Sequence, residues 1–223
     1  MAVASLIGPG QAATITWGSA SGITSSTSVL NNGSAVSAIN YAGTAQTVNG
    51  VSFASGGGET STWWTGYGGN STGDAGLDNI LNNHQTSYGS PTHPTEFEMS
   101  LTGLSIGQQY QIQLIGIHDL RSATSTRTYT LPDQTGVTPA YTGPQLARGA
   151  GGNDGGGSGS AAGTVVGTFT AGAVTEVIWI TNTVAPGGND PGLSGYALRA
   201  IPEPSSAALL GLGGLALILR RRK

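Results

Sequence analysis

The sequence predicts an all-β protein: an antiparallel β-sandwich of jelly-roll type with one short helix, followed by a single apolar helix at the C-terminus. Short segments rich in Thr, Val, Ile and aromatic residues alternate apolar with polar positions, as half-buried strands do. Clusters of Gly, Asn, Ser and Pro separate these segments, and the chain holds 38 Gly in 223 residues. It has no Cys, which excludes disulfides, thiolate metal sites and a cysteine nucleophile.

Two segments show the clearest strand pattern. Phe97, Met99 and Leu101 alternate with polar residues, and Tyr110, Ile112 and Leu114 alternate with glutamines. The short loops between strands favour antiparallel sheets over alternating strands and helices. Further strands are expected at 13–17, 47–53, 127–131, 164–170, 176–182 and 194–201.

One helical pattern interrupts the strands. Leu77, Ile80, Leu81 and His84 recur at the spacing of one helix face, and Asp74 is placed to cap the first turn. We expect a short helix that packs on the sandwich or across one of its ends.

The segment 101–110 predicts a turn that crosses between sheets. A strand ends, a glycine-containing turn follows, and Tyr110 opens the next strand, where its hydroxyl can bond back to the turn. This pattern is the tyrosine corner of Greek-key sandwiches and is locally similar to fibronectin type III domains.

The charge is concentrated at the C-terminus. Four of the eight basic residues are the last four, so residues 1–219 carry four basic against eleven acidic residues, a net charge of −7. An acidic chain with a pI near 5.4 lacks the electrostatics for nucleic-acid binding. The basic end, which would stop transfer across a membrane and stay in the cytoplasm, consists of Arg220, Arg221, Arg222 and Lys223.

The segment before the basic end is apolar. Residues 207–219 contain only Ala, Leu, Ile and Gly. As a helix they span about 20 Å, which is short of the roughly 30 Å hydrocarbon core of a bilayer. A helix that is apolar on all sides and lies at a chain end has no partner in a sandwich, so its position favours a membrane segment.

Upstream, Pro202, Glu203 and Pro204 hold the chain extended and unable to join a sheet. The string IPEPSSAALLGLGGLALILRRRK closely resembles the PEP-CTERM sorting signal of bacterial exported proteins. The resemblance implies that an exosortase-type membrane peptidase recognises these three residues. It also implies that the chain rests transiently in the inner membrane and then reaches the cell surface or extracellular matrix. The alternative is an ordinary single-pass tail anchor.

The chain divides into three parts on this interpretation. Residues 1–13 are expected to be a remnant or truncated signal peptide, residues 14–201 the sandwich, and residues 202–223 the sorting tail. The body is similar in outline to the jelly-roll, carbohydrate-module-like bodies that often precede such tails, since about 190 residues exceed a single fibronectin-type domain.

The body shows no catalytic motif, and we predict that it is not an enzyme. No Gly-x-Ser-x-Gly occurs, and His84, His93 and His118 lack ligand or triad spacing. Glu96 and Glu98 share one strand face about 7 Å apart, which is a separation that suits the two carboxylates of an inverting glycoside hydrolase. Any two polar residues on the solvent-facing side of a strand have the same spacing.

Glycan binding is the alternative function for a body that is otherwise structural. Trp63, Trp64 and Tyr67 lie in a segment rich in glycine and could stack on a sugar of an extracellular polysaccharide. Adjacent tryptophans in a strand would instead point to opposite faces. No cofactor is expected, although Asp154 and Asp190 each follow a Gly-Gly-Asn sequence and are candidates for a calcium site.

Overall fold

The computed structural model describes ten stretches of the chain, and the structural statements below refer to these stretches. They are residues 12–56, 62–64, 72–86, 96–116, 118–119, 128–136, 140–147, 149–150, 162–181 and 191–202.

The largest element is an eight-stranded sheet with β17 (Gly195–Ala200) near its centre, between β9 (Gln109–Ile115) and β3 (Ser34–Tyr41). β9 and β17 are antiparallel along their whole paired length, from Gly195 opposite Ile115 to Ala200 opposite Tyr110. The remaining strands are β1 (Thr16–Trp17), β2 (Ser21–Gly22), β4 (Gln46–Val48), β5 (Val51–Gly56) and β14 (Gly163–Thr170).

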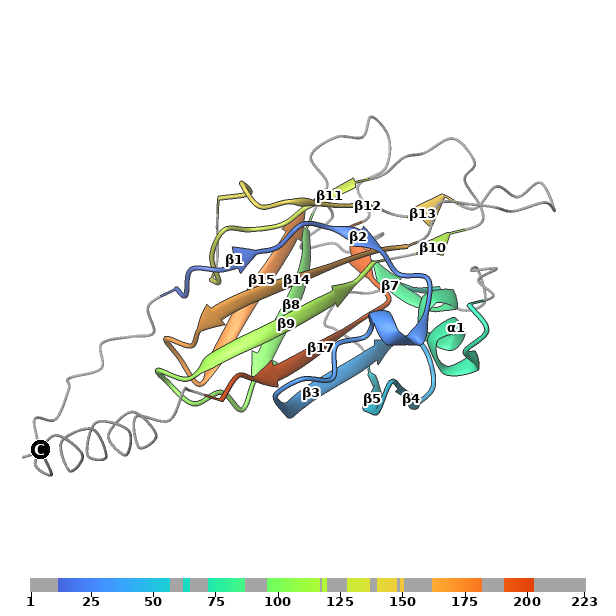
Figure 1. Ribbon diagram of the computed structural model, residues 1–223. Coiled ribbons are helices and arrows are strands. Elements are labelled where there is room, and N and C mark those ends of the chain that lie inside the picture. The colour runs from blue at the N-terminus through green and yellow to red at the C-terminus, as the bar shows by residue number, and fades with distance from the viewer. Residues whose placement is uncertain are drawn as a thin grey trace, which may run out of the picture.

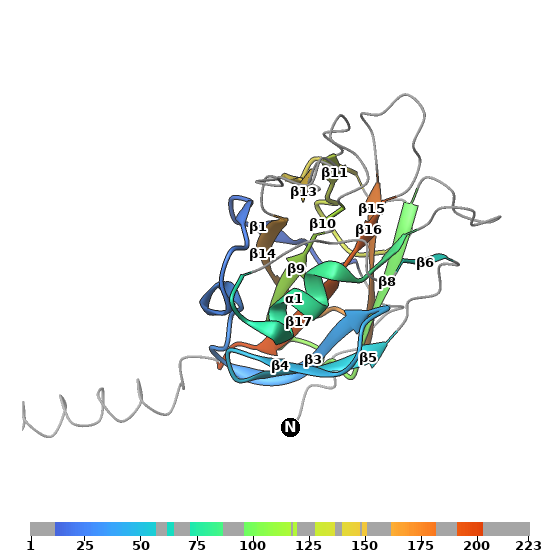
Figure 2. The same ribbon diagram turned by 90° about the vertical axis from the view of Figure 1, so that its right-hand side faces the viewer.

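A second, four-stranded sheet packs against the first. It consists of β12 (Gln145–Ala147), β11 (Thr128–Thr130), β15 (Thr175–Thr181) and β8 (Glu96–Thr102), in that order. Phe97 and Met99 from β8 share one core cluster with Ile112 of β9 and Leu198 of β17. The two sheets form separate layers in Figure 2, so the described body is a β-sandwich.

The outer face of the larger sheet is also covered. Helix α1 (Ala75–Asn82) buries Leu77, Ile80 and Leu81 in a second core. The helix lies at the end of the sheet opposite the end where β17 finishes (Figure 1), as expected of a helix across one end. The 3-10 turn η1 (Ser26–Ser28) lies in the segment that contributes Ile23 and Val29 to the same core.

Two small sheets complete the described elements. β16 (Gly192–Leu193), β7 (His84–Thr86) and β6 (Thr62–Trp64) form one antiparallel sheet. β10 (His118–Asp119) and β13 (Gly149–Ala150) form a parallel pair.

The structure confirms several sequence predictions. Alternation in β8 places Phe97, Met99 and Leu101 in the core, with the intervening residues half-buried or exposed. Asp74 caps α1, since its carboxylate accepts a hydrogen bond from the Leu77 amide at 2.9 Å. The body is mostly β with one short α-helix among the described residues, whereas the specific jelly-roll connectivity stays a prediction.

Four local predictions need correction. The segment 47–53 is not one strand but parts of β4 and β5, joined by a tight turn in which Asn49 (φ 49°) and Gly50 (φ 75°) are left-handed. The first strand covers only Thr16–Trp17 of the predicted 13–17. His84 begins β7, because α1 ends at Asn82. The main sheet is mixed, since β3 and β5 run parallel.

The predicted apolar helix at 207–219 lies outside the described residues, as do residues 1–11. Within the part of the chain that the structure describes, no helix is long and apolar enough to cross a membrane. The proposed division at residues 13 and 201 therefore stays a prediction.

Candidate functional site

The sandwich holds the chain up to the last residue before the predicted sorting motif. The Ile201 amide donates to the Gln109 carbonyl at 2.9 Å, one residue beyond the end of β17. The Gln108 side-chain amide donates to the Ile201 carbonyl at 2.7 Å. Pro202 follows directly and is exposed. The hydrogen bonds of the sheet therefore reach Ile201, the residue directly before the Pro-Glu-Pro motif.

A rigid turn holds these contacts in place. The Tyr110 hydroxyl accepts a hydrogen bond from the Ser105 amide at 2.7 Å, which confirms the predicted tyrosine corner. Gly103 (φ 76°) and Gly107 (φ 84°) take left-handed conformations that a side chain would strain. Gln108 leaves this turn, so its bond to Ile201 anchors the exit of the chain to the corner.

The rest of the predicted sorting tail, including Glu203 and Pro204 and the basic residues Arg220, Arg221, Arg222 and Lys223, lies outside the described residues. The structure thus places the first motif residue, Pro202, and leaves the roles of the others as predictions.

The predicted aromatic platform is described only in part. Trp63 and Trp64 lie in β6, where they pair with Gln85 and His84 of β7. Tyr67 lies outside the described residues, so the structure does not test whether the three rings form one surface.

The candidate calcium residues Asp154 and Asp190 also lie outside the described residues. Among the residues that the structure does place, no group of three or more His, Asp or Glu side chains is close enough to hold a metal ion.

Glu96, one of the two candidate catalytic carboxylates, has a specific structural contact. Its Oε1 accepts a hydrogen bond from the Tyr141 hydroxyl at 2.7 Å. Burial raises the pKa of Tyr141 strongly, and the bond to Glu96 raises it further, so the phenol remains a donor. Glu96 and Glu98 are both half-buried, on either side of the buried Phe97. The contact gives Glu96 a role in fixing the loop that contains Tyr141.

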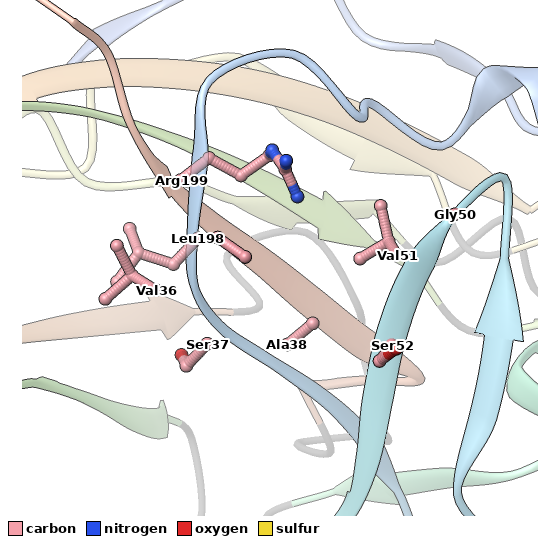
Figure 3. A pocket seen from close by; sticks show the side chains of 9 residues that line it. Val36, Ser37, Ala38, Gly50, Val51, Ser52, Leu198 and Arg199 are labelled. Carbon is pink, nitrogen blue, oxygen red and sulfur yellow. The ribbon is translucent and has the colours of Figure 1, made fainter.

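A pocket that the sequence did not suggest lies where β3 and β5 diverge. These parallel strands pair from Ile39 and Ala54 onward, but not at the earlier residues, and a space of about 200 Å³ opens between them. A bulge at the junction of Leu198 and Arg199 accompanies the gap. The pocket is lined by Ala35, Val36, Ser37, Ala38, Gly50, Val51, Ser52, Leu198 and Arg199 (Figure 3).

Arg199 gives the pocket its charge. It is the only Lys or Arg among the described residues, and its side chain extends toward Val51 in Figure 3. Its Nε donates to the Asn32 carbonyl at 2.5 Å and its Nη2 to the Gly33 carbonyl at 2.7 Å. A guanidinium has five N–H donors, so these carbonyls fix the group while other donors remain for a ligand.

Gly33 permits this arrangement. It is left-handed (φ 76°), and a Cβ at this position would lie 2.5 Å from the Ala200 carbonyl oxygen. The close approach of the 32–33 backbone to β17 brings both carbonyls to Arg199. No local signal in the sequence marks Arg199, because the pocket joins residues more than 140 positions apart.

Two solved structures are similar in fold to part of this chain. The extracellular domain of ANXUR1 from Arabidopsis thaliana has a TM-score of 0.45 at 10% identity, covering 76% of this chain and 49% of that one. The ANX2 ectodomain from Arabidopsis thaliana has a TM-score of 0.44 at 11% identity, covering 76% of this chain and 50% of that one. The chain thus spans about half the length of each.

In a comparison with curated proteins, none matches this sequence. Residues 200–223 match the family described as the PEP-CTERM protein-sorting motif. The match includes Pro202, Glu203 and Pro204 and the basic end, as the resemblance implied. The chain therefore carries a PEP-CTERM protein-sorting motif, which implies an exported protein processed by an exosortase, attached to a β-rich body.

Proposed function

We propose that the chain is a cell-surface or extracellular-matrix protein whose non-catalytic body is displayed outside the cell after exosortase processing. One observation carries the proposal: residues 200–223 match the PEP-CTERM protein-sorting motif. The structure adds that β17, in the middle of the larger sheet, continues through the hydrogen-bonded Ile201 straight into Pro202. The folded body and the sorting motif are therefore adjacent. Whatever holds the tail at the membrane also holds the folded body close to it.

This adjacency sets where processing can occur. A protease needs an extended substrate that it can separate from other strands, whereas 195–201 is bonded to neighbouring segments of the sheet. Proline has no amide hydrogen, so Pro202 ends the ladder. We infer that the peptidase cuts beyond Pro202 and leaves the whole body intact.

The test uses the full chain in a host that contains an exosortase. Glu203→Ala is expected to leave unprocessed protein in the inner membrane, because the carboxylate between the two prolines is lost. Ser205→Ala, outside the Pro-Glu-Pro motif, is the matched control and should be processed normally. Normal release of the Glu203→Ala chain would refute exosortase sorting through this motif. The intact mass of released protein should place its C-terminus after Pro202, and a C-terminus within 195–201 would contradict the inferred cut.

A second candidate function is glycan association, and the Arg199 pocket favours it. A volume of about 200 Å³ suits a single sugar ring, with Val36 and Val51 available for its apolar face and Arg199 for a carboxylate. We therefore propose an acidic sugar, such as a uronic acid, as the ligand class. Trp63, Trp64 and Tyr67 remain a second proposed contact surface.

Retention on immobilised alginate, a polyuronate, compared with neutral dextran tests this candidate. Arg199→Gln should abolish retention on alginate, while Arg199→Lys should keep part of it because the charge is preserved. Trp63→Ala and Trp64→Ala test the aromatic surface in the same assay. Unchanged retention of Arg199→Gln would reject the pocket, and no retention of the unaltered chain would reject glycan association with this polymer.

We also propose that Glu96 and Glu98 are not a catalytic pair, since the Glu96 carboxylate is held by Tyr141. Glycan turnover that is lost in both Glu96→Gln and Glu98→Gln would overturn this and favour a glycoside hydrolase.

A further inference from the structure

Two large hydrophobic side chains stand out on the described surface. Ile106 is 44% exposed and Val174 is 62% exposed, and they are the only exposed large hydrophobic residues among those whose exposure the structure describes, which do not include Trp63 and Trp64. Isolated exposed hydrophobic residues are common on soluble proteins and need no explanation. What needs explanation here is their common location.

Both residues lie in loops that are bonded to each other. Ile106 belongs to the turn between β8 and β9, and Val174 to the turn between β14 and β15. The Leu104 amide donates to the Val174 carbonyl at 3.1 Å, and the Gly107 amide to the Ala171 carbonyl at 2.8 Å. The two exposed side chains are therefore on one rigid double turn, which we call the exit turn (residues 103–108 and 171–174).

The exit turn is also where the chain leaves the body. Gln108 accepts a bond on its backbone carbonyl from the Ala171 amide at 3.0 Å, and its side chain holds the Ile201 carbonyl. In Figure 1 the arrowheads of β14 and β17 point to this same end of the sandwich, away from α1. The two exposed hydrophobic residues Ile106 and Val174 thus lie at the end of the sandwich where the sorting motif starts.

The length of the tail limits how far this end can be from a membrane. Four residues lie between Pro202 and Ala207, where the apolar run begins. Even a fully extended chain spans at most about 17 Å from Pro202 to Ala207, of which the headgroup region on one side of a bilayer takes up about 5–8 Å. While the apolar segment is inserted, the exit turn must lie next to the membrane surface.

We propose that the exit turn docks on the outer surface of the inner membrane before processing, with Ile106 and Val174 inserted among the lipid headgroups. The proposal rests on the proposed function, since it requires the tail to be inserted. Docking would fix the orientation of the body and hold the chain beyond Pro202 at a constant height for the membrane peptidase. Two side chains alone bind a bilayer weakly, so the body would leave the membrane once the tail is cut.

The absence of cysteine from the chain makes the test direct. Single variants Ile106→Cys, Val174→Cys and Ser21→Cys of the full chain are labelled with the fluorophore NBD. They are then reconstituted into phosphatidylethanolamine and phosphatidylglycerol vesicles. Ser21 is the matched control, because it is exposed and pairs with Thr164 at the opposite end of β14. Matching thermal unfolding curves for the three labelled chains verify that each is folded.

Labels at 106 and 174 are expected to shift their emission to the blue and to be quenched several-fold more than the Ser21 label by headgroup-nitroxide lipids. The docking proposal would be overturned if all three labels show equal, water-like emission in chains that resist alkaline carbonate extraction. That result would still support insertion of the tail in the membrane. Extraction of the whole chain by carbonate would instead refute the membrane insertion, and docking with it. A shift at 106 and 174 that occurs only after an exosortase is added would identify a protein contact and also overturn lipid docking.

Discussion

Glu176 should contribute more to the stability of the body than any other described carboxylate. Its side chain is 4% exposed and lies at the start of β15, next to the exit turn. Oε1 accepts hydrogen bonds from the Gly172 amide at 2.8 Å and the Ala173 amide at 3.0 Å. Oε2 accepts from the Thr135 hydroxyl at 2.5 Å, and that hydroxyl accepts from the Ala13 amide at 2.7 Å. Replacement of Glu176 by Ala removes the acceptor for three donors at once.

The cost can be worked out donor by donor. Thr135 is 1% exposed, so water cannot replace its lost partner, and a bond to a charged group contributes about 2 kcal/mol. Gly172 and Ala173 are only half-buried, and partial hydration reduces the loss to about 1 kcal/mol each. The total is about 4 kcal/mol, which corresponds to a decrease in Tm of about 10 °C for a chain of this size.

Thermal unfolding of the full chain in mild detergent, followed by circular dichroism, measures this decrease. Glu176→Gln keeps an acceptor for both amides and loses only the Thr135 bond, so its Tm should fall by about half as much. Ser100→Thr, at an exposed position of β8, is the matched control and should leave Tm unchanged. A Tm for Glu176→Ala within about 2 °C of the unaltered chain would refute the reasoning, because it would mean that the three donors find water or other partners.

Three further predictions concern stability. Tyr110→Phe removes the acceptor of the Ser105 amide and should lower the free energy of unfolding by about 1–2 kcal/mol in urea titrations, a loss that an unchanged midpoint would exclude. Gly195→Ala places a Cβ 2.5 Å from the Ile39 carbonyl oxygen in the middle of the sheet. It should therefore destabilise the body by at least about 3 kcal/mol, and wild-type thermal stability would contradict this close approach. Burial raises the pKa of Tyr41 well above its ordinary value, because the folded body favours the neutral phenol. The stabilisation from this preference is complete below about pH 10 and is lost as the pH rises above that value. Tm measured from pH 8 to 12 should fall only above pH 10, less steeply in Tyr41→Phe.

The strands that were predicted correctly are those whose own side chains decide their burial. In β8 large apolar residues alternate with polar ones, so the hydrophobic effect alone selects the buried face. In α1, three apolar residues on one face and the Asp74 cap determine the helix locally. The tyrosine corner is equally local, because Tyr110 bonds to an amide only five residues earlier.

Strands that depend on their neighbours were missed. β3 is eight residues long, yet its small and polar residues give no amphipathic pattern. It forms a strand because β17 and β5 pair with it on its two sides. Gln113 shows the same effect: its position in the alternation of β9 marks a polar face, but it is 2% exposed. The segment before β3 covers it, and its side chain bonds to the Leu30 amide and the Ser28 carbonyl.

The sequence by itself determined the sorting motif, because an exosortase signal is read along the chain as a contiguous string and needs no fold to be recognised. Short strands, the capped helix and the tyrosine corner were determined in the same way, by residues a few positions apart. Only the tertiary structure decided that β17 runs into the motif without a linker. It also decided that Arg199 lines a pocket with Val36 and Val51, and that Ile106 and Val174 lie at the end of the sandwich where the chain exits. These features join residues far apart in the sequence, and their proximity depends on how the strands pair, which local patterns do not encode.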